Sequence, residues 1–354
     1  MDKVILQAKD LDGFLSPEDR KSIAIVNDKF GEAVKEFPAL ASGGGTESKK
    51  RAEERLIQIF NDLGELMQEI VSREHPIHVY SLETPEVIHG EASRLVAKLR
   101  DSRTENPEFI YYIQRAYEML FHLAFTGNRS GERHPIIVRT PVDIPVENFA
   151  VHKIPDIDRL TDNSVMCVML RAALLPSMIV SKEIQEYSSR NYITPFALFK
   201  ISRDDARREQ DMIYTLDLKK SHFSLEMLDG KDLFFADPMN ATGGSLVTIV
   251  TYLLEKGIRP GSIKFFNVVS TLKGALRIVR AIPGAEVYTL WMDPALNEKA
   301  YILPGLGDAG DRINGCDDRE RPRDIIQLIA DYGTRVTSLY RDQIRRIEEI
   351  VLSH

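Results

Sequence analysis

The chain has 354 residues, of which 43% are hydrophobic and 28% charged, and its formal net charge is -7. This length is enough for one large domain or two ordinary ones, and the acidic balance argues against nucleic acid or an anionic membrane as a partner. The two cysteines, Cys167 and Cys316, match neither a disulfide framework nor metal-ligand spacing, and no run is long and apolar enough to span a bilayer. Because the start also lacks an apolar leader, we expect a cytoplasmic protein.

Residues 1–84 are expected to form a helical extension, interrupted by the glycine-rich stretch at 43–50. One face of the helix predicted over 51–71 carries the apolar residues Leu56, Ile59, Phe60, Leu63, Met67 and Ile70. Amphipathic helices usually serve a core, so packing against the protein's own body is favoured roughly two to one over docking of a separate partner.

Residues 89–125 continue as two helices, and Asn106-Pro107 marks the start of the second. Strands and helices then alternate: a strand and helix over 164–184, a strand over 232–239, a helix over 245–257, a strand over 263–270, a helix over 273–284 and a strand over 285–292. This alternation indicates βαβ units, and hence an α/β fold with a parallel sheet covered by helices on both faces. Residues 317–354 are helical again and either cap the sheet or join two subunits.

The sequence ADPMNATGGS, residues 236–245, follows a predicted strand and opens a predicted helix. Ligands bind beyond the carboxyl ends of the strands in such sheets. The glycine pair lets the backbone approach an anion, and the flanking hydroxyls add donors to the free N–H groups of the helix N-terminus. A simple turn with a helix cap explains the last four residues equally well. The carboxylate of Asp237, however, would be repelled by a bound anion unless it contacts another group. A phosphorylated sugar supplies such a group through its hydroxyls.

This loop resembles the 5-phosphoribosyl-1-diphosphate (PRPP) loop of type I phosphoribosyltransferases, in the Asp-Pro version of the uracil phosphoribosyltransferase family. The resemblance implies a type I phosphoribosyltransferase fold, with Asp237 on the ribose hydroxyls and residues 242–245 around the 5-phosphate. The PRPP contacts that it implies are Arg171, Arg203, Asp237, Pro238, Met239, Asn240, Ala241, Thr242, Gly243, Gly244, Ser245 and Asp308.

A second glycine-rich segment, YILPGLGDAGDRINGC at 301–316, resembles the base-binding segment of the same family. Its glycines expose backbone N–H and C=O groups, which can pair with the alternating carbonyls and N–H of uracil and would mispair with the amino group of cytosine. A glycine-rich surface turn is the less favoured alternative. The uracil contacts implied by the resemblance are Ile302, Gly307, Asp308 and Ala309.

A third segment, MLRAALLPSM at 169–178, resembles the diphosphate loop of the family and makes Arg171 the expected diphosphate contact. A guanidinium suits this role because it pairs with phosphate oxygens through two hydrogen bonds. A surface arginine that merely follows a buried strand is the alternative. Ala173 and Leu175 stand where the family has small glycines.

The mobile hairpin of the family aligns loosely with residues 201–221. Arg203 is the expected PRPP contact there, Arg207 or Arg208 could serve instead, and a solvated charge run is an equal alternative. Further along, Lys273 stands where the family has an acid, which places a base near the expected site.

The resemblance covers about residues 86–316, so we expect an extension over 1–84, a phosphoribosyltransferase domain over 85–316 and a helical extension over 317–354. It implies synthesis of UMP and diphosphate from uracil and PRPP in pyrimidine salvage, with Asp308, Arg171 and Asp237 as catalytic residues. Mg²⁺ would be held mainly by PRPP, the chain would form a homo-oligomer, and GTP is a candidate effector. The alternative is a regulatory protein that binds PRPP or a nucleotide with little turnover, which the altered diphosphate loop and the extensions motivate.

Overall fold

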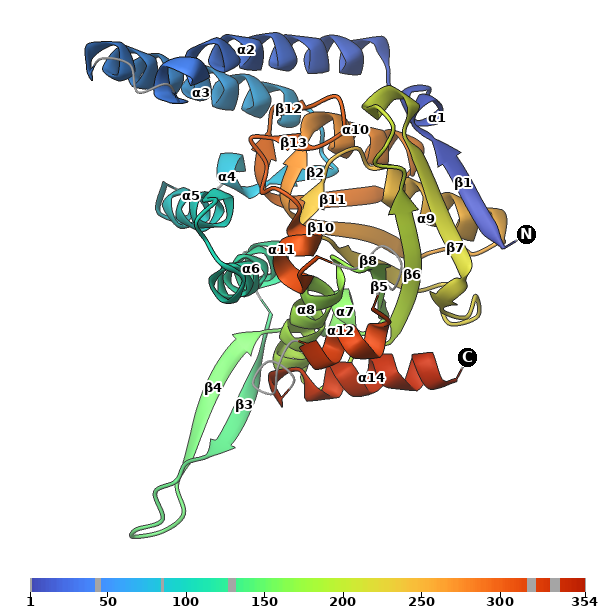
Figure 1. The fold of residues 1–354 in the computed structure, drawn as a ribbon. Helices are drawn as coiled ribbons and strands as arrows, with labels where there is room; N and C mark the ends of the chain where they lie inside the picture. The colour runs from blue at the N-terminus through green and yellow to red at the C-terminus, as the bar shows by residue number, and fades with distance from the viewer. Residues whose placement is uncertain are drawn as a thin grey trace.

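The computed structural model describes residues 2–41, 46–83, 86–126, 132–316, 323–331 and 338–353, and its centre is a nine-stranded sheet (Figure 1). In spatial order the strands are β1 (Lys3–Gln7), β7 (Ile213–His222), β6 (Phe196–Arg203), β5 (Ser164–Leu170), β8 (Asp232–Ala236), β10 (Ser262–Thr271), β11 (Ala285–Asp293) and β2 (Ile77–Val79). The two-residue strand β9 (Met239–Asn240) pairs with β10.

The strands from β6 to β2 are parallel, whereas β7 and β1 are antiparallel to their neighbours. One face is covered by α5 (Glu86–Arg100), α6 (Asn106–Phe121) and α8 (Leu174–Tyr187), and the other by α9 (Gly244–Glu255) and α10 (Leu272–Ala281). The central strands are buried on both faces, which explains why β5 reads as a continuous apolar run. The predicted α/β fold is therefore confirmed, together with the predicted helix start at Asn106.

The N-terminal part differs from a purely helical extension. Two of its segments, β1 and β2, are strands of the main sheet, at its opposite edges, so the expected boundary after residue 84 falls within one continuous sheet structure. Between them, α2 (Pro17–Ala41) and α3 (Thr46–Val71) form a helix pair that projects from the body (Figure 1). Ile59, Leu63 and Met67 of the predicted stripe are buried, mainly against α2, whereas Phe60 is exposed, so the stripe packs within this chain but largely inside the helix pair.

The C-terminal helices α12 (Ile325–Asp331) and α14 (Arg341–Leu352) lie against the body. Helix α14 contacts α8 and β6, and Tyr340, Ile344 and Ile347 are buried, while Leu339 is about half exposed. The expectation that this segment caps the sheet is thus confirmed, and a role in joining subunits stays a prediction.

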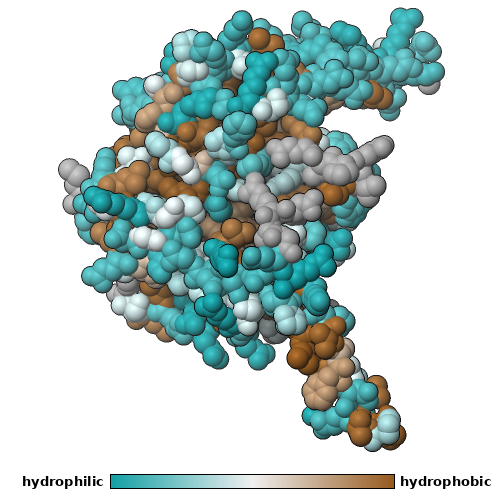
Figure 2. All heavy atoms as spheres, turned by 180° about the vertical axis from the view of Figure 1, so that it is seen from behind, coloured by the Kyte–Doolittle hydropathy of each residue, from teal (hydrophilic) through white to brown (hydrophobic). Residues whose placement is uncertain are grey.

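An arm that the sequence analysis did not anticipate is the antiparallel hairpin of β3 (Arg133–Arg139) and β4 (Phe149–Pro155), which extends away from the body (Figure 1). Many of its apolar side chains face solvent, and Figure 2 shows them as brown patches along the arm. The remaining short elements are α1 (Ala8–Asp12), α4 (Tyr80–Glu83), the π-helix His122–Thr126, α7 (Asp158–Thr161), the 3-10 helix η2 (Glu209–Asp211), β12 (Ala295–Leu296), β13 (Ile302–Leu303) and α11 (Ala309–Asn314). Every helix in the described part of the chain is too short or too polar to cross a membrane.

Candidate active site

The expected PRPP loop lies at the carboxyl end of β8 and runs into the N-terminus of α9, as predicted. Gly243 has a φ of +74°, and a Cβ there would lie 2.9 Å from the carbonyl oxygen of Gly274 on α10. Glycine is therefore required at this position both by the backbone conformation and by the close approach of α10. Asn240 is buried and donates to the Ser270 hydroxyl at 3.0 Å.

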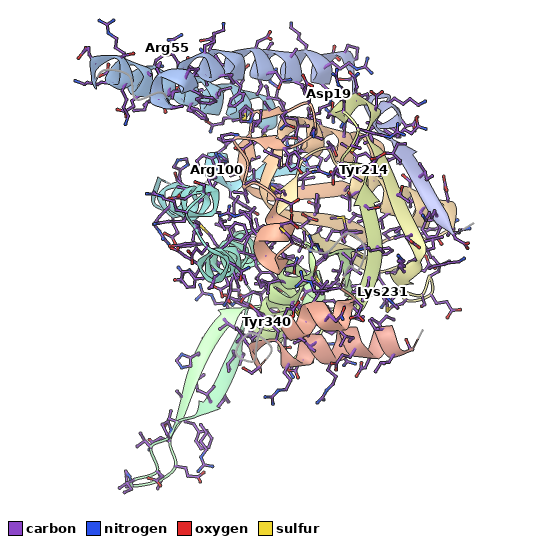
Figure 3. All side chains as sticks on the ribbon, viewed as in Figure 1. Asp19, Arg55, Arg100, Tyr214, Lys231 and Tyr340 are labelled. Atoms are coloured by element: carbon purple, nitrogen blue, oxygen red, sulfur yellow. The ribbon has the colours of Figure 1, made fainter. Side chains whose placement is uncertain are left out.

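Tyr214 of β7, labelled in Figure 3, contacts this loop. Its hydroxyl oxygen is 2.5 Å from the Oγ1 atom of Thr242, and a Cβ on Gly244 would lie 2.2 Å from its Cζ atom. The cavity along the loop has a volume of about 90 Å³, below the roughly 300 Å³ at which ligand pockets usually begin. A sugar phosphate would therefore require part of the cavity wall to shift.

Asp237 lies in this cavity, where Met239 N donates to its Oδ1 atom at 3.2 Å. Burial raises the pKa of Asp237 to about 7; the Met239 hydrogen bond and the positive charge of Arg203 oppose the rise, and the negative charge of Asp308 adds to it. Arg203 lines the same cavity and also contacts Ala300 and Tyr301, so the PRPP loop, the hairpin and the start of the base-binding segment converge.

The hairpin formed by β6 and β7 contributes Arg203, which lines the same cavity as Asp237. Its guanidinium donates to the carbonyl of Ala300 at 3.3 Å and lies 4.9 Å from the centre of the Tyr301 ring. Arg207 instead pairs with Asp204, and Arg208 with Glu298. Of the three candidates, the structure brings Arg203 to the PRPP loop.

The base-binding segment begins with β13 and ends in α11. Gly305 and Gly307 have φ values of +64° and +73°, and the amide of Gly305 donates to the buried carboxylate of Asp293 at 2.9 Å. Asp308 is exposed and caps α11 by accepting a hydrogen bond from the Asp311 amide at 2.9 Å.

The side chains of Ile302 and Ala309 are buried, and Gly307 is exposed beside them. Reading of a base at this segment would therefore use main-chain groups, in line with the predicted use of glycine. Arg312 fixes the segment to the turn between α5 and α6, where it donates to the carbonyls of Asp101 and Thr104, each at 3.1 Å.

Arg171 follows β5 as predicted, but it lines a different cavity from the PRPP loop. Its guanidinium forms an ion pair with Asp311 and donates to the carbonyl of Gly315 at 2.9 Å. Ala173 has ordinary helical dihedral angles, and its side chain and that of Leu175 are buried in the core. Neither side chain is therefore excluded by its surroundings at these two positions.

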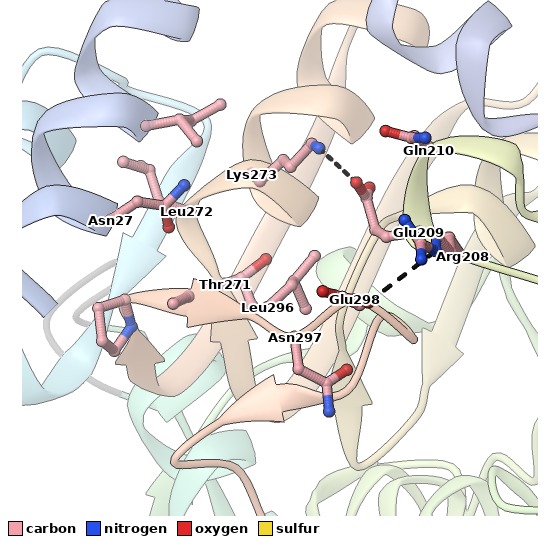
Figure 4. Close-up of a pocket in the computed structure, with 13 residues that line it drawn as sticks. Asn27, Arg208, Glu209, Gln210, Thr271, Leu272, Lys273, Leu296, Asn297 and Glu298 are labelled. Carbon is pink, nitrogen blue, oxygen red and sulfur yellow. Dashed lines mark hydrogen bonds and ion pairs between the residues drawn. The ribbon is translucent and has the colours of Figure 1, made fainter. Parts of the chain in front are cut away.

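Lys273 lines a cavity of about 370 Å³ between α2, η2, α10 and β12, shown in Figure 4. Its ammonium group pairs with Glu209 at 2.9 Å, and Glu298 lies across the cavity near Arg208 at 3.9 Å. The neighbouring Arg277 is fully buried and touches the PRPP loop. The sequence analysis did not identify Arg277. The basic residue Lys273, at a position where the family has an acid, was the only feature of the sequence that indicated a cluster of charges here.

Among the described residues, no three His, Cys, Asp or Glu side chains gather in a way that could hold a metal ion. The negative charge of Asp308 opposes ionisation of Asp237, which lines the cavity, and so adds to the rise in the pKa of Asp237. A cation brought by a phosphorylated ligand would relieve this repulsion, because oxygen ligands suit Mg²⁺.

Comparison with known proteins agrees with this geometry. A sequence profile described as uracil phosphoribosyltransferase matches residues 192–316. The uracil phosphoribosyltransferase of Campylobacter concisus is 31% identical over 215 residues, which cover 61% of this chain and 89% of that protein. The chain belongs to the uracil phosphoribosyltransferase family. The family member from Streptococcus mutans is 46% identical over 90 residues, or 25% of this chain and 42% of that protein.

Similarity to solved structures is weaker. A protein from Aquifex aeolicus is 23% identical with a TM-score of 0.45, covering 64% of this chain and 95% of that one. The orotate phosphoribosyltransferase of Mycobacterium tuberculosis, solved in complex with PRPP, is 13% identical with a TM-score of 0.32, covering 61% and 95%.

Membership of the uracil phosphoribosyltransferase family supports phosphoribosyl transfer as the class of reaction. The matched range holds the hairpin, the PRPP loop and the base-binding segment. It leaves out β1, the α2–α3 pair and the C-terminal helices, so the family profile gives no role to these parts.

Proposed function

We propose that the protein is a uracil phosphoribosyltransferase that makes UMP and diphosphate from uracil and PRPP in pyrimidine salvage. The observation that carries this proposal is that Arg203 of the hairpin lines one cavity with Asp237 of the PRPP loop and also contacts Tyr301, at the start of the base-binding segment. Family membership supports the same reaction class.

In the proposed reaction, the N1 atom of uracil forms a bond to the anomeric carbon of PRPP while the bond to the diphosphate oxygen breaks, and the N1 proton is lost. Asp237 would accept hydrogen bonds from the ribose hydroxyls, and the amides of residues 242–245 would hold the 5-phosphate. Arg171 would stabilise the negative charge that grows on the departing diphosphate. Mg²⁺, carried in by PRPP, would supply further charge neutralisation at those oxygens. The chemistry requires no side-chain nucleophile, because the chain has only to hold the two substrates in line.

The test is the formation of nucleotide by purified protein from PRPP, Mg²⁺ and each of uracil, cytosine, orotate and adenine. We expect UMP alone, and we expect Asp308→Asn and Arg171→Ala to reduce its rate by at least about a hundredfold, the usual scale for a lost charge-stabilising group. Efficient use of another base, or no effect of either variant, would contradict the proposal.

The second candidate is a regulatory protein that binds PRPP or a nucleotide without turnover. The observation in its favour is the small cavity under Tyr214, which leaves little room at the PRPP loop. Under this alternative, PRPP or UMP would raise the melting temperature while no base reacted.

We also propose that two copies of the chain associate through the β3–β4 hairpin. An isolated two-stranded hairpin is marginally stable in water, and here Ile144 is 80% exposed and Phe149 is 60% exposed. The mass in solution, measured by light scattering, should equal that of a dimer or larger assembly and fall when Ile144 and Val146 are both replaced by serine. A wild-type monomer would contradict the proposal. A cytoplasmic location and regulation by GTP stay predictions.

A further inference from the structure

Arg277 of α10 is the largest fully buried side chain in the described part of the chain, and its charge is balanced by two acids from distant segments. Its Nη2 atom lies 2.5 Å from Asp12 Oδ1, and its Nη1 atom lies 3.0 Å from Glu209 Oε1. Asp12 ends α1 in the N-terminal segment, and Glu209 begins η2 in the hairpin. The buried cation therefore joins both segments to α10.

The same guanidinium reaches the PRPP loop. Nη1 of Arg277 donates to the carbonyl oxygen of Thr242 at 3.4 Å. The helix that carries Arg277 is pressed against the loop, since a Cβ on Gly274 would lie 2.7 Å from the Ala241 carbonyl oxygen. A shift of α10, or a rotation of the Arg277 guanidinium, would therefore change the conformation of the Thr-Gly-Gly turn.

The N-terminal segment is itself held in place by the hairpin. Strand β1 pairs with β7 along its whole length, from Lys3 opposite Asp217 to Gln7 opposite Ile213. The next amide, of Ala8, donates to the Met212 carbonyl at 2.9 Å. Residues 3–12 therefore form a strap that follows the hairpin strand bearing Tyr214 and ends at Arg277.

We propose that this N-terminal strap, residues 3–12, completes the phosphate-binding loop, and that Asp12 is a positioning residue that acts through Arg277. The proposal rests on the proposed function only in taking residues 242–245 as the phosphate site. In the described part of the chain, Asp12 makes no hydrogen bond or ion pair with that loop; it holds the guanidinium that does.

The physical reason is the cost of an unbalanced buried charge. Removing one partner of a buried ion pair is strongly destabilising, because the remaining charge keeps its desolvation penalty. If Asp12 is removed, Glu209 is the acid that remains in this cluster, and Arg277 and Lys273 both pair with it. The guanidinium of Arg277 is then expected to turn toward Glu209. The Thr242 carbonyl would then lose its donor, and the loop amides would lose their fixed direction.

Helix α10 offers a matched control one turn further on. Arg280 pairs with Asp19 of α2 at 2.9 Å and with Glu74 at 2.6 Å. Asp19→Asn therefore also breaks an ion pair between the N-terminal part and α10. Unlike Arg277, however, Arg280 has no recorded contact with the PRPP loop.

The experiment measures binding of ribose 5-phosphate by calorimetry, and KM values for PRPP and uracil, in wild type, Asp12→Asn, Asp12→Glu and Asp19→Asn. We expect Asp12→Asn to weaken ribose 5-phosphate binding by about tenfold, the scale of one charge-assisted hydrogen bond. The KM for PRPP should rise with it while the KM for uracil stays unchanged. Asp12→Glu should recover most of the affinity, and Asp19→Asn should bind like wild type even if it melts earlier.

The proposal is overturned if Asp12→Asn binds ribose 5-phosphate like wild type, if Asp19→Asn weakens binding as much, or if wild type does not bind it at all. A wild type that binds ribose 5-phosphate but makes no UMP would refute the proposed function alone, and the difference between Asp12→Asn and Asp19→Asn would still decide the role of the strap.

Discussion

The hydroxyl oxygens of Tyr214 and Thr242 lie 2.5 Å apart, buried between β7 and the PRPP loop. Burial raises the pKa of Tyr214, so its hydroxyl keeps its proton at neutral pH and can donate to Thr242 while Thr242 donates to a phosphate. Such chains of hydrogen bonds strengthen one another. Tyr214→Phe should therefore raise the KM for PRPP about fivefold, corresponding to about 1 kcal/mol, with little change in the KM for uracil. A lower KM for PRPP would mean that the tyrosine obstructs the site instead.

The contact between Gly244 and the Tyr214 ring predicts a large effect of a single methyl group. Gly244→Ala would place a Cβ 2.2 Å from the ring, a clash that the buried ring can relieve only by moving, at a typical overpacking cost of about 1 to 3 kcal/mol. Thermal unfolding should show a clearly lower melting temperature. The matched control is Gly64→Ala in α3, where nothing lies within 4 Å of the new Cβ. Alanine should stabilise that helix by up to about 1 kcal/mol, and equal effects at the two sites would contradict the packing described here.

Asp237 predicts a specific dependence of stability on pH. Its pKa is about 7 in the folded protein, above the ordinary value of 3.8, so between these two pH values the folded state binds more protons at this residue than the unfolded state. The contribution of Asp237 to stability must then fall as pH rises through this window and level off above about pH 7. The difference in unfolding free energy between Asp237→Asn and wild type should therefore favour the variant more at about pH 8 than at about pH 5, as measured by denaturant unfolding.

Asp19 supplies the control of opposite sign. Burial alone would raise the pKa of Asp19, but hydrogen bonds from Arg280 and Ser16 lower it overall. Its stabilising contribution is present above the ordinary pKa and is lost as pH falls through the folded value. Asp19→Asn should accordingly lose more stability relative to wild type near neutral pH than in acid. If the stability of the Asp19 and Asp237 variants relative to wild type changed with pH in the same direction, the lowered pKa of Asp19 and the raised pKa of Asp237 would both be refuted.

The ion pair between Arg171 and Asp311 predicts competition with diphosphate. If Arg171 must leave Asp311 to bind the leaving group, Asp311→Asn removes the competing ion pair, and inhibition by diphosphate should strengthen about fivefold, the upper scale of a partly exposed pair. Arg171→Ala should weaken inhibition by diphosphate. A loss of diphosphate affinity in both variants would instead show that Asp311 orients the arginine for binding.

Short-range signals made much of this structure predictable. The buried strands, their following helices and the two glycine-rich segments all carry local patterns, and the structure brings the expected PRPP contacts Arg203 and Asp237 to one cavity. Long-range contacts were not predictable in the same way. Strand β2 has only three residues, which is too short for a recognisable pattern. The contact between Asp12 and Arg277 joins residues 265 positions apart, so no local sequence pattern predicts it.

The partners of two expected site residues were likewise set by tertiary packing. Arg171 was placed correctly after β5, yet its pairing with Asp311 depends on how α11 meets that strand. Tyr214 reads in the sequence as an ordinary strand residue, and its position over Gly244 follows from the register of β7 against β6. Local sequence patterns therefore predicted where the loops lie, whereas tertiary packing determines which side chains cover them.

The most direct test of the account is a stoichiometric assay of purified full-length protein with uracil, PRPP and Mg²⁺, in which UMP and diphosphate are quantified together. The account predicts that both products appear in equal amounts and that neither forms when uracil is left out. Absence of UMP from a folded sample that binds PRPP would contradict the enzyme assignment and leave a PRPP-binding protein in its place.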